Sequence, residues 1–268
     1  MTRIEKAFAQ PGVKLIPFVT VGDPDLDATA RIIVRMAAEG ADLVELGIPY
    51  SDPVADGPVI QASSQRALDR GVRLADVFGV VRQVRAHSEV PLILFTYCNP
   101  VFRYGLERFM QEAAAAGADG LIMPDIPPEE AAEIREAAGR HGLATVFLVA
   151  PTSTPERIGL LCEASEGFVY LVAATGVTGV RSQLATDLGD YLARVKAKSR
   201  LPVAVGFGVS TPEHATDLAR MGADAVVVGS ALVDRIGRWA QEPDLVERVG
   251  QFVHDLKAGA LLAAAPAS

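Results

Sequence analysis

The sequence predicts an α/β protein that folds as a (β/α)8 barrel, also called a TIM barrel. Eight short apolar runs recur along the 268 residues, and patterns typical of helices separate them. Runs that are apolar almost throughout indicate parallel strands covered on both faces. Eight such strands alternating with helices within about 250 residues are the pattern of this barrel.

The expected strands follow one another at fairly even intervals along the chain. They are LIPFVT (15–20), LVELGIP (43–49), PLILFTY (91–97), GLIMPD (120–125), ATVFLVA (144–150), GFVYLVA (167–173), PVAVGFG (202–208) and AVVVGSA (225–231). An open doubly wound sheet is the structural alternative. It normally has fewer strands, and no GxGxxG motif follows the first run as such a fold would favour.

Helical patterns fill the intervals between these runs. DLDATARIIVRMAAEG places Ile33 and Met36 on one helical face, and Gly40 suits the C-terminal cap of that helix. STPEHATDLARMG carries Ser210 and Glu213 at the spacing of a capping box, which predicts a helix beginning at Ser210. The patterns therefore support alternating strands and helices.

A weak internal repeat supports the same count of units. The tripeptide GAD occurs at Gly40, Gly117 and Gly222, each time between a helical pattern and an apolar run. Because no linker interrupts the repeated units, we expect one domain over residues 1–268. The low-complexity tail AGALLAAAPAS is expected to fray from about residue 258.

Composition excludes several classes of protein. The net charge of −8 argues against nucleic acid as a partner. Cys98 and Cys162 form no CxxC motif and fit a reduced, cytoplasmic protein. The N-terminus lacks the apolar core of a signal peptide, and no apolar run reaches the roughly 18 residues of a membrane span. We therefore expect a cytoplasmic protein without a membrane partner.

The polar residues at the strand ends point to the active site, because barrel enzymes place it at the C-terminal ends of their strands. Glu45 falls in the second strand, Tyr97 and Asn99 lie at and after the end of the third, and Asp125 follows the fourth. No histidine or lysine stands at a predicted strand end. Zinc, Schiff-base and covalent pyridoxal-phosphate chemistry therefore have no candidate residue, which leaves carboxylate acid–base chemistry on a phosphorylated substrate.

Two glycine-rich turns follow the last two strands. GFGVS and VVGSAL each precede a helix, so Gly206, Gly208 and Gly229 would let an anion approach backbone N–H groups. The loops after strands 7 and 8 are the usual phosphate site of such barrels, and Ser230 could add a hydroxyl contact. Ordinary tight turns are the alternative explanation for either loop taken alone.

The stretch ELGIPYSDPVADGP (45–58) carries the acidic groups. A glutamate in an apolar strand is costly unless it faces a polar cavity or pairs with an arginine, and both readings of Glu45 stay open here. Asp56 follows on a loop stiffened by prolines, which could set a second carboxylate opposite the first. Asp52 fits a turn better than a catalytic role, and Asp125 fits stabilisation of the barrel mouth.

Several motifs together resemble the tryptophan synthase alpha subunit family. They are PFVTVGDPD (17–25), VELGIPYSDPVADGPVIQ (44–61), GVTG (176–179), VGFGVS (205–210) and VVVGSA (226–231). The resemblance spans nearly the whole chain. It implies a barrel with an extra N-terminal helix and active-site loops after strands 2 and 6. It also implies retro-aldol cleavage of indole-3-glycerol phosphate to indole and glyceraldehyde 3-phosphate, in tryptophan biosynthesis.

The resemblance also implies roles for individual residues. The catalytic pair falls on Glu45 and Asp56. The phosphate site falls on Gly179, Gly208, Gly229 and Ser230, the indole pocket on Phe18, Tyr97, Ile122 and Tyr170, and the lid on Gly176 and Thr178. Some family members carry arginine where this chain has Ala174, which changes one lid contact.

A partner is implied as well. The family docks a beta subunit, which holds pyridoxal phosphate, through positions matching Pro53, Asn99 and Phe102, in an α2β2 heterotetramer. Three alternatives remain: a stand-alone lyase releasing free indole, a barrel isomerase for another phosphorylated sugar, and a non-catalytic regulatory subunit. The presence of both Glu45 and Asp56 disfavours the last.

Overall fold

Parallel strands form a nearly closed barrel in the computed structural model, which describes residues 1–172, 181–206 and 208–262 without the side chains of residues 181–187. The strand order is β5-β4-β3-β2-β1-β9-β8-β7-β6. The strands are β1 (Lys14–Thr20), β2 (Val44–Gly47), β3 (Leu92–Phe95), β4 (Gly120–Ile122), β5 (Ala144–Val146), β6 (Leu148–Val149), β7 (Val169–Val172), β8 (Val203–Gly206) and β9 (Ala225–Val228).

The predicted barrel is confirmed, and each of the eight expected strands is present. The fifth appears as two pieces, because the strand pattern is interrupted at Phe147. Its first piece, β5, pairs with β4, and its second piece, β6, pairs with β7. The chain through Phe147 therefore connects the two ends of the sheet in the nearly closed barrel.

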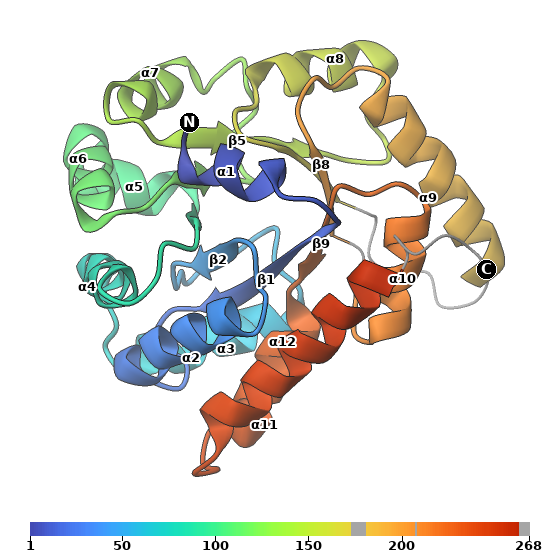
Figure 1. Cartoon of the computed structure of the whole chain (residues 1–268). Coiled ribbons are helices and arrows are strands. Elements are labelled where there is room, and N and C mark those ends of the chain that lie inside the picture. Colours follow the sequence, from blue (N-terminus) through green and yellow to red (C-terminus); the bar gives the residue numbers. More distant parts are fainter. Residues whose placement is uncertain (173–180, 207, 263–268) are drawn as a thin grey trace.

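Helices surround the barrel on the outside, as Figure 1 shows. They are α1 (Arg3–Ala9), α2 (Leu26–Ala38), α3 (Pro58–Asp69), α4 (Leu74–Arg85), α5 (Cys98–Tyr104), α6 (Leu106–Ala116), α7 (Ala132–Arg140), α8 (Pro155–Ala164), α9 (Arg181–Lys196), α10 (Pro212–Arg220), α11 (Ser230–Trp239) and α12 (Leu245–Leu262). No helix among the described residues is long and apolar enough to cross a membrane.

Two apolar layers give the barrel its core. Ile16, Ile93, Val146 and Val227 belong to the inner layer, whereas the opposite strand faces pack against the helices. The expected N-terminal helix, α1, contributes to the inner layer and lies across one end of the barrel in Figure 1. The other end, where the strands terminate, is left for loops and the site.

The GAD repeat fastens the N-terminal ends of the strands. Its glycines adopt left-handed φ values of 105°, 102° and 94°, which favour glycine. Its aspartates each accept the N–H of a residue at the start of a neighbouring strand: Asp42 from Leu15, Asp119 from Leu92 and Asp224 from Val203. The repeat therefore stabilises the end of the barrel opposite the active site.

The start of α10 and the end of α12 bear on two predictions from the sequence. The capping box between Ser210 and Glu213 is wrong, because Thr211 is the N-cap of α10 and accepts the N–H of His214, leaving Pro212 at the first helical position where no N–H is needed. Helix α12 continues to Leu262 with Ala260 buried, so it extends into the segment expected to fray.

Candidate active site

Glu45 is a buried carboxyl group inside the barrel. It lies on β2, in register with Phe18 of β1 and Ile93 of β3, and is 1% exposed. Its Oε1 atom has no hydrogen-bond partner among the described residues. Burial alone raises the pKa of Glu45 to about 8. The alternative of a structural pair with an arginine therefore finds no support in the part of the chain that is described.

Asp56 stands just ahead of α3, on the loop that follows β2. Its own N–H donates to the Pro53 carbonyl at 3.0 Å, and the Gln61 side chain donates to its carbonyl at 2.8 Å. Burial raises the pKa of Asp56 to about 6, and a hydrogen bond from the Tyr97 hydroxyl opposes that rise. The Tyr97 hydroxyl also accepts the N–H of Ala55 at 3.1 Å, so Tyr97 holds this loop at two points.

The two carboxyl groups and Tyr170 form one electrostatic cluster. Burial raises the pKa of Tyr170 well above its usual value, and the charges of Glu45 and Asp56 raise it further. At neutral pH these shifts leave Glu45 mainly protonated and Asp56 mainly ionised. Environments that push two carboxyl pKa values apart are the usual basis for assigning one acid and one acceptor.

The predicted indole-pocket residues are all buried. Phe18 is 7%, Tyr97 2%, Ile122 0% and Tyr170 8% exposed. Two glycines leave room for these rings: a Cβ on Gly47 would lie 2.3 Å from the Phe18 ring, and one on Gly206 would lie 2.8 Å from the Tyr170 hydroxyl. The close approach of the Tyr170 ring therefore explains why glycine occupies position 206, whereas the sequence indicated the approach of an anion there.

The turns after β8 and β9 leave open space at the predicted phosphate positions. A Cβ on Gly208 would meet nothing within 4 Å, and one on Gly229 would meet only the Phe18 Cβ, at 4.0 Å. Gly229 is the N-cap of α11 and Ser230 is its exposed first residue. Gly179 and the lid positions Gly176, Thr178 and Ala174 lie outside the described residues.

The surface expected to face a partner is apolar and exposed. Val54 is 83% exposed and Phe102 is 48% exposed, with Pro53 partly exposed beside Val54. Asn99, also exposed, donates from its side chain to the Tyr50 hydroxyl at 3.0 Å. This contact joins the first turn of α5, which follows β3, to the loop that carries Asp56.

Two other acidic residues have structural explanations. Asp125 accepts the N–H of Cys98 through both carboxylate oxygens, at 3.1 and 3.0 Å, and so fixes the start of α5 at the barrel mouth. Asp52 is exposed and accepts from the Ser51 hydroxyl. Burial raises the pKa of the Cys98 thiol to about 11, which disfavours the reactive thiolate.

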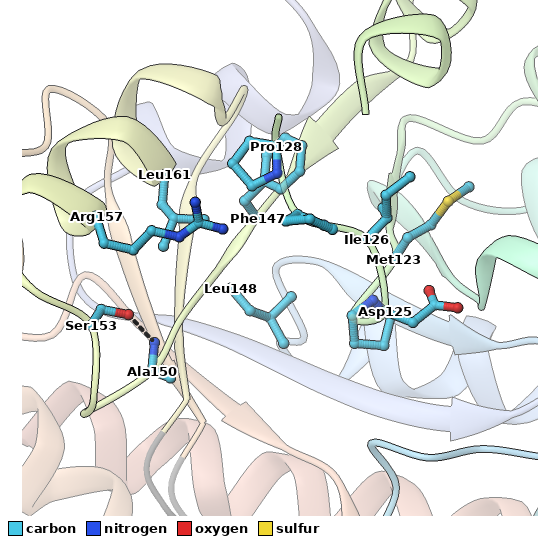
Figure 2. Close-up of a pocket in the computed structure, with 12 residues that line it drawn as sticks. Met123, Asp125, Ile126, Pro128, Phe147, Leu148, Ala150, Ser153, Arg157 and Leu161 are labelled. Carbon is cyan, nitrogen blue, oxygen red and sulfur yellow. Dashed lines mark hydrogen bonds between the residues drawn. The ribbon is translucent and has the colours of Figure 1, made fainter. Parts of the chain in front are cut away.

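A cavity of about 310 Å³ borders the site on the side of β4 and β6. Figure 2 shows Leu148 between Asp125 on one side and Ser153 on the other, with Phe147 and Pro128 above it. Leu148 pairs in register with Tyr170. None of the four predicted indole-pocket residues lines this cavity. Its link to the pocket is Leu148, which lines the cavity and pairs with Tyr170.

Sequence reasoning missed several residues around the pocket. Phe95 meets Phe18 edge-on at a ring-centre distance of 5.7 Å, and Ile60 of α3 and Val233 of α11 pack against the same ring. Thr20, at the end of β1, where the sequence already indicated polar groups at the barrel mouth, has a buried hydroxyl without a partner among the described residues. Strand alternation from Tyr97 would have identified Phe95, whereas the helix contacts carry no such signal.

No group of three or more metal-binding side chains occurs among the described residues. The described part of the site has two carboxyl groups with separated pKa values, a buried aromatic pocket and two open glycine turns. Such an arrangement can hold an apolar ring beside a proton donor and an acceptor, with an anion bound at the turns.

Comparisons with known proteins agree on one family. The family model described as Tryptophan synthase alpha chain matches residues 4–260. The tryptophan synthase alpha chain of Rippkaea orientalis is 51% identical over 243 residues, which is 91% of this chain and 91% of that protein. The structure of tryptophan synthase subunit alpha from Legionella pneumophila has a TM-score of 0.89 at 37% identity and covers 97% of this chain and 98% of that chain. A chain of the tryptophan synthase α2β2 complex from Pyrococcus furiosus has a TM-score of 0.84 at 41% identity, covering 92% and 98%.

Proposed function

The chain belongs to the tryptophan synthase alpha chain family, and we propose that Glu45 and Asp56 carry out the carbon–carbon cleavage for which the family is known. The reaction converts indole-3-glycerol phosphate into indole and glyceraldehyde 3-phosphate. The observation that carries this proposal is the buried Glu45 carboxyl group, whose Oε1 atom has no hydrogen-bond partner among the described residues and whose pKa is about 8. It forms a cluster with Asp56, whose pKa is about 6.

The chemistry of the cleavage requires these two protonation states. An aromatic carbanion is a poor leaving group, so C3 of indole must gain a proton before the bond to the glycerol chain breaks. Glu45, protonated at neutral pH, supplies that proton. Asp56, ionised at neutral pH, accepts the indole N–H and stabilises the positive charge that develops on the ring.

The second half of the reaction returns the proton. Glu45, now a carboxylate, removes the proton of the side-chain hydroxyl next to C3. The carbon–carbon bond then breaks, its electron pair returns to the indole ring, and the aldehyde carbonyl forms. Glu45 ends the cycle protonated, as it began, so we propose that neither a metal nor an organic cofactor takes part.

A direct assay tests this function. Purified chain is incubated with indole-3-glycerol phosphate, and the release of indole is followed with and without a beta subunit. Cleavage that yields indole and glyceraldehyde 3-phosphate in equal amounts supports the proposal. Isomerisation of the substrate without loss of indole would identify the sugar-isomerase alternative instead.

We place the substrate phosphate at the turns after β8 and β9. Gly229→Val is expected to raise KM for indole-3-glycerol phosphate at least about 10-fold, because a branched side chain fills the open space at the start of α11. The steady-state KM and the melting temperature of both proteins are measured. The matched control is Gly139→Val on α7, where a Cβ also meets nothing within 4 Å. Equal KM values for Gly229→Val and the control would remove the phosphate from this turn.

The partner we propose is a beta subunit that carries pyridoxal phosphate and docks on Pro53, Asn99 and Phe102, in an α2β2 assembly like that of the Pyrococcus furiosus relative. Exposed apolar groups on the loop beside Asp56 favour this surface. A partner packed there would increase the population of the active loop arrangement, within the limit of its differential affinity.

Beta-subunit activation depends on this contact. Adding a beta subunit is expected to raise indole release about 5–150-fold, the range of typical coupling energies. Pro53→Ala should reduce that activation more than it reduces the rate of the isolated chain. The comparison is a titration of both proteins with beta subunit, with Pro243→Ala, an exposed proline between α11 and α12, as the control. Full activity of the isolated wild type, unchanged by the partner, would favour the stand-alone lyase.

Two further expectations belong to the same proposal. We propose that the whole chain acts as one catalytic domain, with the lid positions Gly176 and Thr178 closing over the substrate and Gly179 contacting its phosphate. We also propose a cytoplasmic location. The continuous barrel of the described residues and the family match over residues 4–260 support the first of these.

A further inference from the structure

Asp23 is a buried carboxylate that the proposed reaction does not use. It follows β1, and its side chain is 1% exposed. It accepts three hydrogen bonds: from Arg66 Nε at 3.0 Å, from Arg66 Nη2 at 2.6 Å and from the Ser63 hydroxyl at 2.7 Å. All three donors lie on α3, so Asp23 binds this one helix to the end of β1.

Arg66 and Asp23 form a two-point contact. The guanidinium group of Arg66 meets both carboxylate oxygens, and such a two-point contact sets the orientation of the groups as well as their separation. The same Nη2 atom that donates to Asp23 also lies close to α11, because a Cβ on Gly237 would come within 2.9 Å of it. Arg66 is therefore held between the end of β1 and α11.

Asp56 is attached to the start of helix α3. Asp56 lies two residues before the helix begins at Pro58, and Gln61 in its first turn donates to the Asp56 carbonyl at 2.8 Å. Near this end Ile60 packs against Phe18 and Val233. Apolar packing alone tolerates small sliding and rotation, whereas the hydrogen bonds of Asp23, one to two turns later, define a single register.

We propose that Asp23, Ser63 and Arg66 are positioning residues that set the register of α3 and thereby place the Asp56 carboxylate opposite Glu45. This inference rests on the proposed role of Asp56. None of the three is a predicted substrate contact. Their loss shifts Asp56 relative to the indole N–H, and a displacement of about 1 Å at a reacting group can cost roughly 10²-fold in rate.

The expected signature is a change in kcat without a matching change in KM. Arg66 contacts α11 at Gly237, about two turns beyond the phosphate turn at the start of that helix, so we expect substrate capture to persist when α3 shifts. Arg66→Gln is expected to lower kcat for indole release about 10-fold or more, with KM within about threefold of wild type. Ser63→Ala, which removes one of the three hydrogen bonds and no charge, should lower kcat by a smaller factor.

Arg70→Gln is the matched control. Arg70 directly follows the last residue of the same helix and has nearly the same side-chain exposure (42% against 40%). Its Nη1 atom donates to the Arg66 carbonyl and lies 3.7 Å from Asp23, a longer ion pair without a hydrogen bond. The substitution removes the same charge and leaves the three-bond contact intact. Its kcat is expected to stay within about twofold of wild type.

A double-mutant cycle tests whether the effect passes through Asp56. We compare wild type, Arg66→Gln, Asp56→Asn and the double variant, with melting temperatures recorded and kcat measured per folded molecule. In the Asp56→Asn background, Arg66→Gln should cost less than about twofold, because the group that it positions is already lost. The same cycle with Ser63→Ala applies if Arg66→Gln fails to fold.

The outcomes separate this inference from the function itself. An inactive Asp56→Asn together with a fully active, folded Arg66→Gln overturns the positioning role alone. Fully additive losses in the cycle overturn it as well, because they place Arg66 outside the action of Asp56. An unchanged kcat in Asp56→Asn would overturn both this inference and the proposed role of Asp56.

Discussion

Glu45→Gln is expected to lower the rate of indole release by roughly 10²–10⁴-fold, the usual contribution of a positioned acid–base group. The amide has nearly the same size and keeps the barrel interior filled, but it can neither give a proton to C3 nor take one from the hydroxyl. The measurement is kcat for indole release with the beta subunit present. The control is Glu163→Gln, an exposed glutamate of α8, which should retain full activity.

The same substitution should change how stability depends on pH. Burial raises the pKa of Glu45 above its unfolded value, so the folded state binds the proton more tightly. The stability associated with this proton is fully present below about pH 4.5 and is lost as pH rises toward about 8. For one such group the loss is about 1.4 kcal/mol per pH unit across that window.

Glu45→Gln removes this component, so the unfolding free energy of the variant should fall less steeply than that of wild type between pH 5 and 8, on the basis of the raised pKa of Glu45. Denaturant unfolding of both proteins at several pH values measures the difference. Parallel stability curves, together with near-wild-type turnover, would show that Glu45 is neither buried as a carboxylic acid nor part of the reaction.

Asp56→Asn is expected to lower kcat by roughly 10²-fold or more, because a neutral amide is a weaker acceptor for the N–H of a ring that is becoming positive. Asp52→Asn is the matched control, since Asp52 lies on the same loop and is exposed, with Ser51 as its contact. Loss of melting temperature with unchanged activity per folded molecule would assign Asp56 a structural role only.

The sequence predicted the barrel because apolar runs and helical patterns are local signals. Apolar runs of 4–8 residues bounded by turn residues are consistent with buried parallel strands, and all eight predicted runs contain strand in the structure. The interruption at Phe147 was not predicted, because its neighbours on both sides are equally apolar. The capping box at Ser210 failed for a similar reason: Ser210 and Thr211 are adjacent candidates, and only the backbone geometry selects Thr211.

The candidate site was predictable as far as strand direction allows. Glu45 and Tyr97 could be placed at the mouth because both lie at strand ends, and the structure buries both there. The contacts of Asp23 with Ser63 and Arg66 bridge about 40 residues of sequence, and no periodic pattern reports such a pairing. The separation of the two carboxyl pKa values depends on burial, which only the folded chain determines.

The pH dependence of kcat/KM for wild type and Asp56→Asn tests the central claim most directly, because kcat/KM reports the pKa values of the free enzyme. With Asp56 near pKa 6 and Glu45 near pKa 8, wild-type kcat/KM should rise through about pH 6, as Asp56 ionises, and fall through about pH 8, as Glu45 loses its proton. The substrate phosphate also titrates near pH 6, so the variant is needed to separate the two groups. The account predicts that Asp56→Asn loses the rise near pH 6 and keeps the fall near pH 8. A rise that persists unchanged in Asp56→Asn, or a wild-type profile without the fall near pH 8, would contradict it.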